Sequence, residues 1–250
     1  MKVGLIGAGN MARALARGWA DPIVCFDPAR DRARALVAEV GGEALESNAA
    51  VAERADVVVL CHKPAQLGEV AGQIGARAKA IVSILGAKPL SEVRAAYPST
   101  PVFRFIPNTP VEVRRGVLCY ALGDGDGDSG LEEEILGLFG RVGRVIAVEE
   151  RSIDTAMGLM STAPAYVALI VEAWVDAGVR RGLAPDQAAE MVVEAVGGTA
   201  ELIAARGMDT LAVRREVTSP GGVTARGLLE LERGGVRVAL ADALDAVLDR

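Results

Sequence analysis

Residues 1–150 alternate short runs of β-branched and apolar residues with longer, alanine-rich stretches. The short runs predict seven strands: Lys2–Ile6, Ile23–Phe26, Val57–Leu60, Ala80–Ile84, Val102–Phe105, Val117–Tyr120 and Arg144–Val148. Helical stretches fall between the earlier strands, among them Met11–Trp19, Arg30–Val40 and Pro64–Ile74. This alternation predicts an α/β domain with right-handed crossovers and a doubly wound, largely parallel sheet. The run VVVL is apolar throughout and AIVSIL is apolar except for Ser83, as in strands covered by helices on both faces.

Residues 151–250 carry only helix-period patterns. Behind the helix-opening Pro185, one apolar stripe comprises Ala188, Met191, Val192, Ala195, Val196 and Thr199. A second stripe in Gly235–Leu248 comprises Val236, Leu240, Leu244, Val247 and Leu248. Stripes this wide need a partner surface, and a second copy of the chain is the simplest one. We therefore expect an all-α dimerisation domain over 151–250 and a homodimer, or a higher oligomer of dimers.

Composition narrows the class of protein. Hydrophobic residues make up 51% and charged residues 24%, which excludes a disordered chain. The net charge of −6 and the lack of a long basic run argue against nucleic-acid and acidic-membrane partners. His62 is the only histidine and the three cysteines are scattered, so we expect no metal site and a reducing compartment. The longest uncharged stretch, Thr155–Val171, is marginally short for a membrane span, and no signal peptide is evident. We expect a soluble, cytoplasmic protein.

The segment Gly123–Gly130 resembles the start of a calcium loop, with alternating Asp124, Asp126 and Asp128. An EF-hand needs Gly at position 6 and Glu at position 12, whereas these positions hold Ser129 and Ile135. An acidic surface loop before a helix is the better interpretation.

A glycine-rich turn, GAGNMA at residues 7–12, follows the first predicted strand and opens a helix. Gly7 allows the tight turn, Gly9 lets the backbone approach a pyrophosphate, and the helix N-terminus attracts its charge. Asp27 ends the second strand 20 positions after Gly7, as in dinucleotide-binding Rossmann domains. We therefore expect a Rossmann domain over residues 1–150.

Two further segments follow strands of the same sheet, at the edge where a dinucleotide binds. Lys63-Pro64 follows Val57–Leu60, and for both His62 and Lys63 a polar strand-to-helix turn is the alternative to ligand contact. Two prolines clamp the Asn108-Thr109 loop, which would hold amide and hydroxyl groups rigidly at this edge, although a structural turn would look the same.

The segment SPGGVT, residues 219–224, precedes the helical stretch Ala225–Arg233. Two glycines before a helix make a cradle of backbone N–H groups suited to a carboxylate or phosphate. Thr224 would then lie in the first turn with its hydroxyl facing the bound group. An ordinary helix cap is the alternative.

In this order, GAGNMA, Lys63-Pro64, RFIPNTP and TSPGGVT resemble the pyrroline-5-carboxylate reductase family over essentially the whole chain. The resemblance implies an N-terminal Rossmann domain and a helical domain that interlocks with a second subunit. It also implies reduction of 1-pyrroline-5-carboxylate to L-proline with NADPH or NADH, a reaction of proline biosynthesis. It also implies cofactor contacts for Gly7, Gly9, Asn10, Met11, Asn48, Lys63, Pro64, Asn108 and Thr109. Ser219, Gly221, Gly222 and Thr224 match the substrate-carboxylate loop, and Thr224 is the candidate catalytic partner of the ring nitrogen.

The chain departs from the family's Ser-Gly-Ser-Gly-Pro-Ala-Tyr, because residues 160–166 read MSTAPAY, and His62 replaces a valine. Both glycines of the turn are lost, which leaves room for a reductase acting on another cyclic imine or small acid. Related hydroxyacid dehydrogenases usually place a catalytic lysine on the central helix, whereas no lysine follows Lys88. A catalytically silent nucleotide-binding protein is the third alternative, and the intact polar groups of the four segments argue against it.

The cofactor preference is open. Asp27 favours NADH, because its charge would repel a 2′-phosphate. Arg30, Arg32 and Arg34 follow closely, and one guanidinium at the ribose would bind that phosphate, although all three also fit a solvated helix face. We expect a preference for NADH with use of both cofactors.

Overall fold

The computed structural model describes residues 1–123 and 129–249. Contacts divide the chain into two compact units, Met1–Pro164 and Ala165–Arg250. The predicted division between residues 150 and 151 stays a prediction. Asp124, Asp126 and Asp128 of the acidic segment lie outside the described residues.

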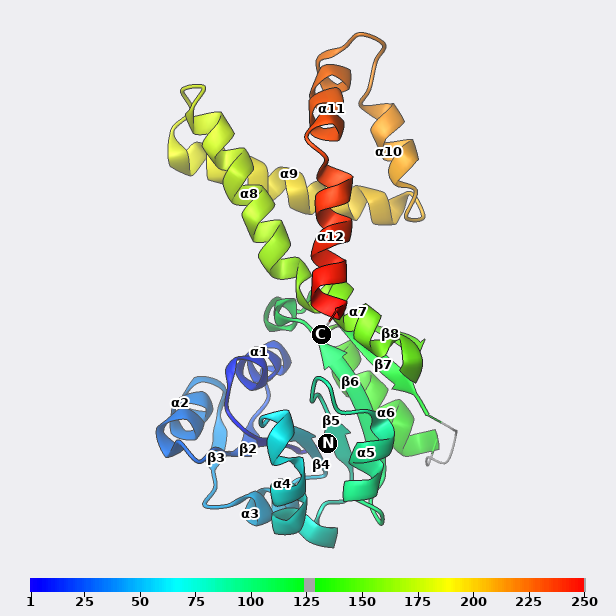
Figure 1. Ribbon diagram of the computed structural model, residues 1–250. Helices are drawn as coiled ribbons and strands as arrows, with labels where there is room; N and C mark the ends of the chain where they lie inside the picture. The colour runs from blue at the N-terminus through cyan, green and yellow to red at the C-terminus, as the bar shows by residue number, and fades with distance from the viewer. Residues whose placement is uncertain (124–128, 250) are drawn as a thin grey trace. The chain divides into compact units, whose positions relative to one another are not determined.

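The first unit is built on one eight-stranded sheet (Figure 1). Its strands are β1 (Val3–Ile6), β2 (Ile23–Phe26), β3 (Gly42–Ala44), β4 (Val57–Leu60), β5 (Ile81–Ser83), β6 (Val102–Pro107), β7 (Gly116–Leu122) and β8 (Gly143–Glu149). They lie in the order β3-β2-β1-β4-β5-β6-β7-β8. All neighbours are parallel except β6 and β7, which run antiparallel with Phe105 opposite Tyr120. The predicted largely parallel, doubly wound sheet is confirmed.

All seven predicted strands are present, but β3 was missed. Its three residues, Gly-Glu-Ala, contain no β-branched or aromatic side chain and lie at the edge of the sheet. Only pairing with β2, with Val24 opposite Glu43, makes this segment a strand. Tertiary pairing therefore overrides a weak local preference.

Helices cover both faces of the sheet and enclose two apolar cores. On one face lie α1 (Asn10–Trp19), α2 (Arg30–Val40) and α6 (Ser129–Gly140), with Trp19 packed edge-on against Phe139. On the other face lie α3 (Asn48–Arg54), α4 (Leu67–Ile74) and α5 (Leu90–Ala96). Short 3-10 turns η1 (Pro64–Gln66), η2 (Gly75–Arg77), η3 (Thr109–Val113) and η4 (Glu150–Ser152) complete the unit with helix α7 (Ile153–Ser161). The carboxyl ends of β1, β2 and β4 therefore form one edge, at which the glycine-rich turn lies.

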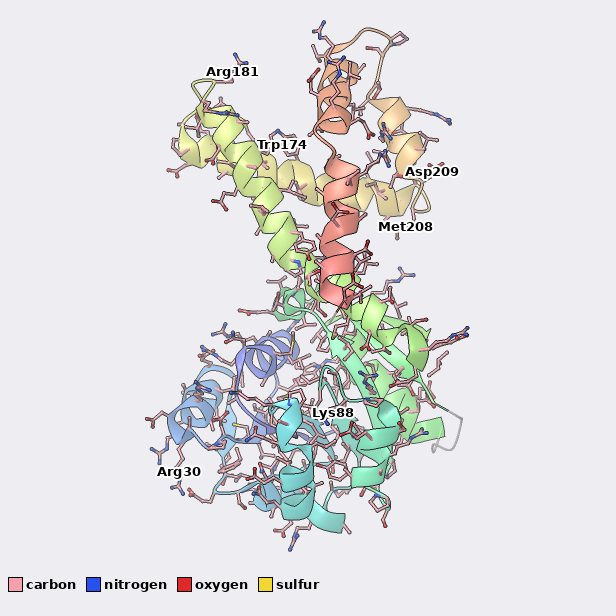
Figure 2. All side chains as sticks on the ribbon, in the orientation of Figure 1. Arg30, Lys88, Trp174, Arg181, Met208 and Asp209 are labelled. Carbon is pink, nitrogen blue, oxygen red and sulfur yellow. The ribbon has the colours of Figure 1, made fainter. Side chains whose placement is uncertain are left out.

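The second unit is entirely helical, as predicted. It contains most of α8 (Ala163–Val179), with α9 (Pro185–Ala205), α10 (Thr210–Glu216), α11 (Val223–Arg233) and α12 (Val236–Leu248). None of the described residues of α8, α11 and α12 is buried. Large apolar side chains are exposed instead, such as Trp174 on α8, 54% exposed (Figure 2), and Met191 on α9. Burial of this surface needs further apolar surface from another molecule.

One helical segment, Glu150–Val179, is long and apolar enough to cross a membrane by length and composition alone. It includes α7, whose Ile153 and Met160 pack into a small core with Ile106 and Cys119 of the sheet. A single segment of this kind is weak evidence for a membrane span.

Candidate active site

The glycine-rich turn between β1 and α1 has the geometry expected of a phosphate-binding loop. Gly7 has φ +99°, and a Cβ there would lie 2.8 Å from the Cys61 carbonyl oxygen, so only glycine fits. Gly9 caps α1, and a Cβ built on it would meet nothing within 4 Å. Its backbone therefore faces open space at a helix N-terminus, which fits a pyrophosphate lying against the chain.

Asp27 ties this turn to the beginning of α2. Its Oδ2 accepts a hydrogen bond from the Ala8 N–H at 2.8 Å, and its Oδ1 accepts one from the Ala29 N–H at 2.8 Å. The residue is only 8% exposed. Its carboxylate thus organises the glycine-rich turn, in addition to any contact with a ribose.

A pocket of about 710 Å³ lies beside Gly7, Gly9 and Asp27. Of the predicted cofactor residues, Asn48 and Lys63 also line it. Asn10 lines an adjoining pocket together with Gly9. Sequence positions up to 56 residues apart therefore meet at one edge of the sheet, as the dinucleotide hypothesis requires.

The other predicted cofactor residues do not line this pocket. Met11 packs its side chain against the core beneath α1. Pro64 opens the turn η1, in which Gln66 accepts from the Lys63 N–H at 3.2 Å. Met11 and Pro64 contribute to the site by shaping the backbone that carries the lining residues.

A row of polar side chains on α4 and the turn before it was missed by the sequence analysis. Gln66, Glu69 and Gln73 line the pocket, and Asn48 donates its amide to Gln73 Oε1 at 2.6 Å. The Asn48 amide oxygen is buried and has no partner within residues 1–123 and 129–249. Gln66, Glu69 and Gln73 have the spacing i, i+3, i+7, which places them on one face of a helix. This spacing is the sequence pattern from which they could have been predicted. An orphaned acceptor in the pocket wall fits a ligand with N–H or O–H donors.

His62 lines the same pocket, and its Nδ1 lies 2.9 Å from the Lys63 carbonyl oxygen. If Nδ1 carries the proton, this bond leaves Nε2 as an acceptor, which is buried and unpartnered within the described chain. Burial lowers the pKa of His62, opposed by the bond to Lys63 and by Glu69. The imidazole is therefore neutral at pH 7 and forms part of the pocket wall.

The three arginines of α2 differ in their surroundings. Arg30, at the outer side of α2 (Figure 2), pairs with Glu46 at 3.0 Å, and Arg34 lies 3.7 Å from Asp31. Arg32 lines both the pocket beside Asp27 and the adjoining one, and it makes no ion pair with any described residue. Of the three arginines, Arg32 is therefore the one that lines the pocket, whereas the sequence left all three open.

Asn108 and Thr109 lie at the carboxyl end of β6, outside both pockets. The Asn108 amide donates to the Met160 carbonyl oxygen at 3.1 Å and accepts from the Val117 N–H at 2.8 Å. These bonds join β6, β7 and α7 and leave the exposed Thr109 hydroxyl as the polar group of this loop.

The Ser219–Thr224 segment belongs to the second unit and forms a turn before α11. Gly221 has φ +71°, and the Gly222 N–H donates to the Ser219 carbonyl oxygen at 3.0 Å. Gly222 caps α11, which has no side-chain cap among the described residues, and Thr224 lies in the first helical turn as predicted. The first N–H groups of α11 therefore lack a side-chain acceptor, which suits an anion.

The departure at residues 160–163 is compatible with the backbone there. Neither Ser161 nor Ala163, which replace glycines of the family pattern, has a positive φ. Ser161 ends α7, Ala163 begins α8, and the Thr162 hydroxyl donates to the Gly158 carbonyl oxygen at 2.6 Å. The fold at this turn does not depend on glycine.

Comparisons with known proteins agree with this arrangement. Residues 150–250 match the family described as pyrroline-5-carboxylate reductase dimerisation, which supports a homodimer, and residues 2–86 match NADP oxidoreductase coenzyme F420-dependent. A pyrroline-5-carboxylate reductase of Glycine max is 34% identical over 99% of this chain and 94% of its own.

Solved structures are similar over the whole chain. The Plasmodium falciparum pyrroline carboxylate reductase with NADP bound has a TM-score of 0.87 at 25% identity, covering 100% of this chain and 96% of that one. The pyrroline-5-carboxylate reductase of Coxiella burnetii has a TM-score of 0.87 at 28% identity, with the same coverage. With the glycine-rich turn and the helical C-terminal region in place, the chain belongs to the pyrroline-5-carboxylate reductase family.

Proposed function

We propose that this protein reduces 1-pyrroline-5-carboxylate to L-proline by hydride transfer from NADH or NADPH. The observation that carries the proposal is the pocket in which Gly7, Gly9, Asp27, Asn48 and Lys63 meet at the carboxyl edge of the sheet. Family membership over the full chain supports the substrate. The cofactor, when bound, supplies the hydride.

The glycine-rich turn would bind the pyrophosphate, since Gly9 leaves the α1 N-terminus open. Asn48 would offer its unpartnered amide oxygen on the adenosine side. Asp27, which lines the pocket, would accept from a ribose hydroxyl, and Arg32 would pair with a 2′-phosphate. Because the pocket contains both the Asp27 carboxylate and the Arg32 guanidinium, it supports the use of both cofactors.

In the second unit, the turn Ser219–Gly222 would bind the substrate carboxylate through backbone N–H groups. Thr224 would hydrogen-bond the ring nitrogen with its hydroxyl and so orient the imine carbon. A protonated cyclic imine is already electrophilic, so alignment is the main requirement and no histidine base is needed. Asn108 would hold the β6 loop, with Thr109 at its surface, on the nicotinamide side of the sheet.

We propose residues 151–250 as the dimerisation and substrate domain. The exposed apolar side chains of α8 and α9 support burial against a second copy of the chain, as a homodimer or a higher oligomer of dimers. The net charge of −6 and the scattered cysteines support a cytoplasmic protein without nucleic-acid or membrane partners.

The test is a spectrophotometric assay at the nicotinamide absorbance, with purified protein, 1-pyrroline-5-carboxylate and each cofactor in turn. Oxidation of NADH or NADPH with matching formation of L-proline is expected. Absence of proline with both cofactors across neutral pH would overturn the proposal.

A further inference from the structure

A third pocket, of about 460 Å³, lies in the first unit at the edge opposite the glycine-rich turn. β6 begins there at Val102, and β7 ends there at Leu122 because it runs antiparallel to β6. The loop Pro98–Pro101 and one side of α5 close the pocket. None of the residues predicted from the sequence to bind cofactor or substrate lines it.

The pocket contains an unpaired cation. Arg94 of α5 is half-buried, and its guanidinium makes no hydrogen bond or ion pair with any residue in 1–123 or 129–249. Its guanidinium lies against Gly123, where an added Cβ would stand 2.6 Å from Nη2. A partly desolvated guanidinium without a counter-ion among the described residues favours an anionic ligand.

A carboxylate lines the same pocket. Glu132 of α6 accepts a hydrogen bond from the Tyr120 hydroxyl at 2.7 Å through Oε1. Both Glu132 and Arg94 act on the pKa of Tyr120, which burial and Glu132 raise and Arg94 lowers, so the two charges lie near one hydroxyl. They do not pair with each other, and the pocket thus offers one charge of each sign.

The rest of the wall is mixed, with apolar side chains beside Ser99, Thr100 and Tyr97. Leu90, Val102 and Phe103 contribute apolar surface. Tyr97 is 3% exposed, and its hydroxyl has no partner among the described residues. A buried hydroxyl without a partner is costly, and a ligand carboxylate would provide an acceptor.

We propose that this pocket binds a small zwitterionic α-amino acid. Its carboxylate pairs with Arg94, its ammonium group pairs with Glu132, and its apolar side chain packs against Leu90 and Phe103. A carboxylate alone leaves Glu132 without an opposite charge, and an amine alone leaves Arg94 without one, so both charges of the ligand are needed. The site is independent of the proposed reaction.

Isothermal titration calorimetry of the full-length protein tests this with L-alanine, L-valine and L-leucine. At least one should bind with a dissociation constant of about 1 mM or lower. Isovalerate and isobutylamine, which each keep one charge of valine, should bind at least about tenfold more weakly than L-valine.

Single substitutions test whether the amino acid binds in this pocket. Arg94→Gln and Glu132→Gln should each raise the dissociation constant at least about tenfold, and Gly123→Ala should weaken binding by pushing the guanidinium aside. Glu133→Gln is the matched control, because Glu133 is the exposed neighbour on α6 and does not line the pocket. Circular dichroism confirms that each variant is folded.

Three results would overturn the proposal: no binding of any of the three amino acids, equal binding of isovalerate and L-valine, or equal effects of Glu132→Gln and Glu133→Gln. Thr224→Ala should leave this binding unchanged, so that a failure here is separate from a failure of the reductase proposal.

Discussion

Replacing Asp27 by serine removes two hydrogen-bond acceptors at the start of the nucleotide pocket. The Asp27 carboxylate accepts from the Ala8 and Ala29 N–H groups, each at 2.8 Å. A serine hydroxyl can accept from Ala29 in a local turn, but it is too short to reach Ala8 as well. The variant therefore leaves the glycine-rich turn without its anchor.

The expected cost follows from these bonds. A hydrogen bond to a charged group contributes about 1.5–3 kcal/mol, and water that enters the pocket recovers part of it. We expect Asp27→Ser to lower the free energy of unfolding by about 1–3 kcal/mol. Because a loosened turn holds any pyrophosphate less well, binding of NADH and NADPH should weaken together.

The ratio of NADPH to NADH affinity tests ribose recognition by Asp27 separately from its anchoring of the turn. Loss of the negative charge removes its repulsion of a 2′-phosphate, so the ratio of NADPH to NADH affinity should rise about tenfold. Arg32→Met should shift the ratio the opposite way, toward NADH, because Arg32 is the arginine that lines the pocket. Arg34→Met is the control on the same helix and should leave the ratio unchanged.

The assays are urea unfolding and fluorescence titration with each cofactor, which need no turnover. Unchanged stability in Asp27→Ser would refute the anchoring role. An unchanged affinity ratio would show that Asp27 does not face the ribose, whatever its effect on stability.

Three further outcomes are expected. Thr224→Ala should lower kcat/KM about ten- to a thousandfold with little change in cofactor affinity. Thr218→Ala is the control and should leave kcat/KM unchanged, because the Thr218 hydroxyl donates to the Arg214 carbonyl oxygen. A Thr224→Ala variant within about twofold of wild type would make Thr224 a helix cap. Light scattering should give at least twice the 25.9 kDa of one chain, and an active species of monomer mass would contradict the dimer. Burial lowers the pKa of His62 below 6.5 in the folded state, so the unfolded state takes up its proton first and stability falls as pH decreases below about 6.5. His62→Val should reduce the pH dependence of the free energy of unfolding, measured in urea, between about pH 7.5 and 5. An unchanged pH dependence would refute the role of His62 in it.

Local patterns in the sequence determined most of the sheet and the glycine-rich turn. Mostly apolar runs of four to six residues predict strands because both faces of a parallel sheet are covered. The glycine-rich turn is equally predictable from the sequence, because Gly7 can adopt the positive φ that the turn requires. The segment Gly42–Ala44 lacks such a pattern, and only its edge position beside β2 makes it a strand.

Contacts between distant segments decided what the side chains do. Asp27 was predicted as a ribose ligand, yet the folded chain places both of its oxygens on backbone N–H groups. The choice of Arg32 among three arginines depends on ion pairs that Arg30 and Arg34 make elsewhere. Arg94, Gly123 and Glu132 share no sequence pattern, and only the antiparallel return of β7 beside β6 brings them to one pocket. Such sites escape prediction because hydrogen bonds and charge pairs depend on distances across the fold, which a single sequence does not specify.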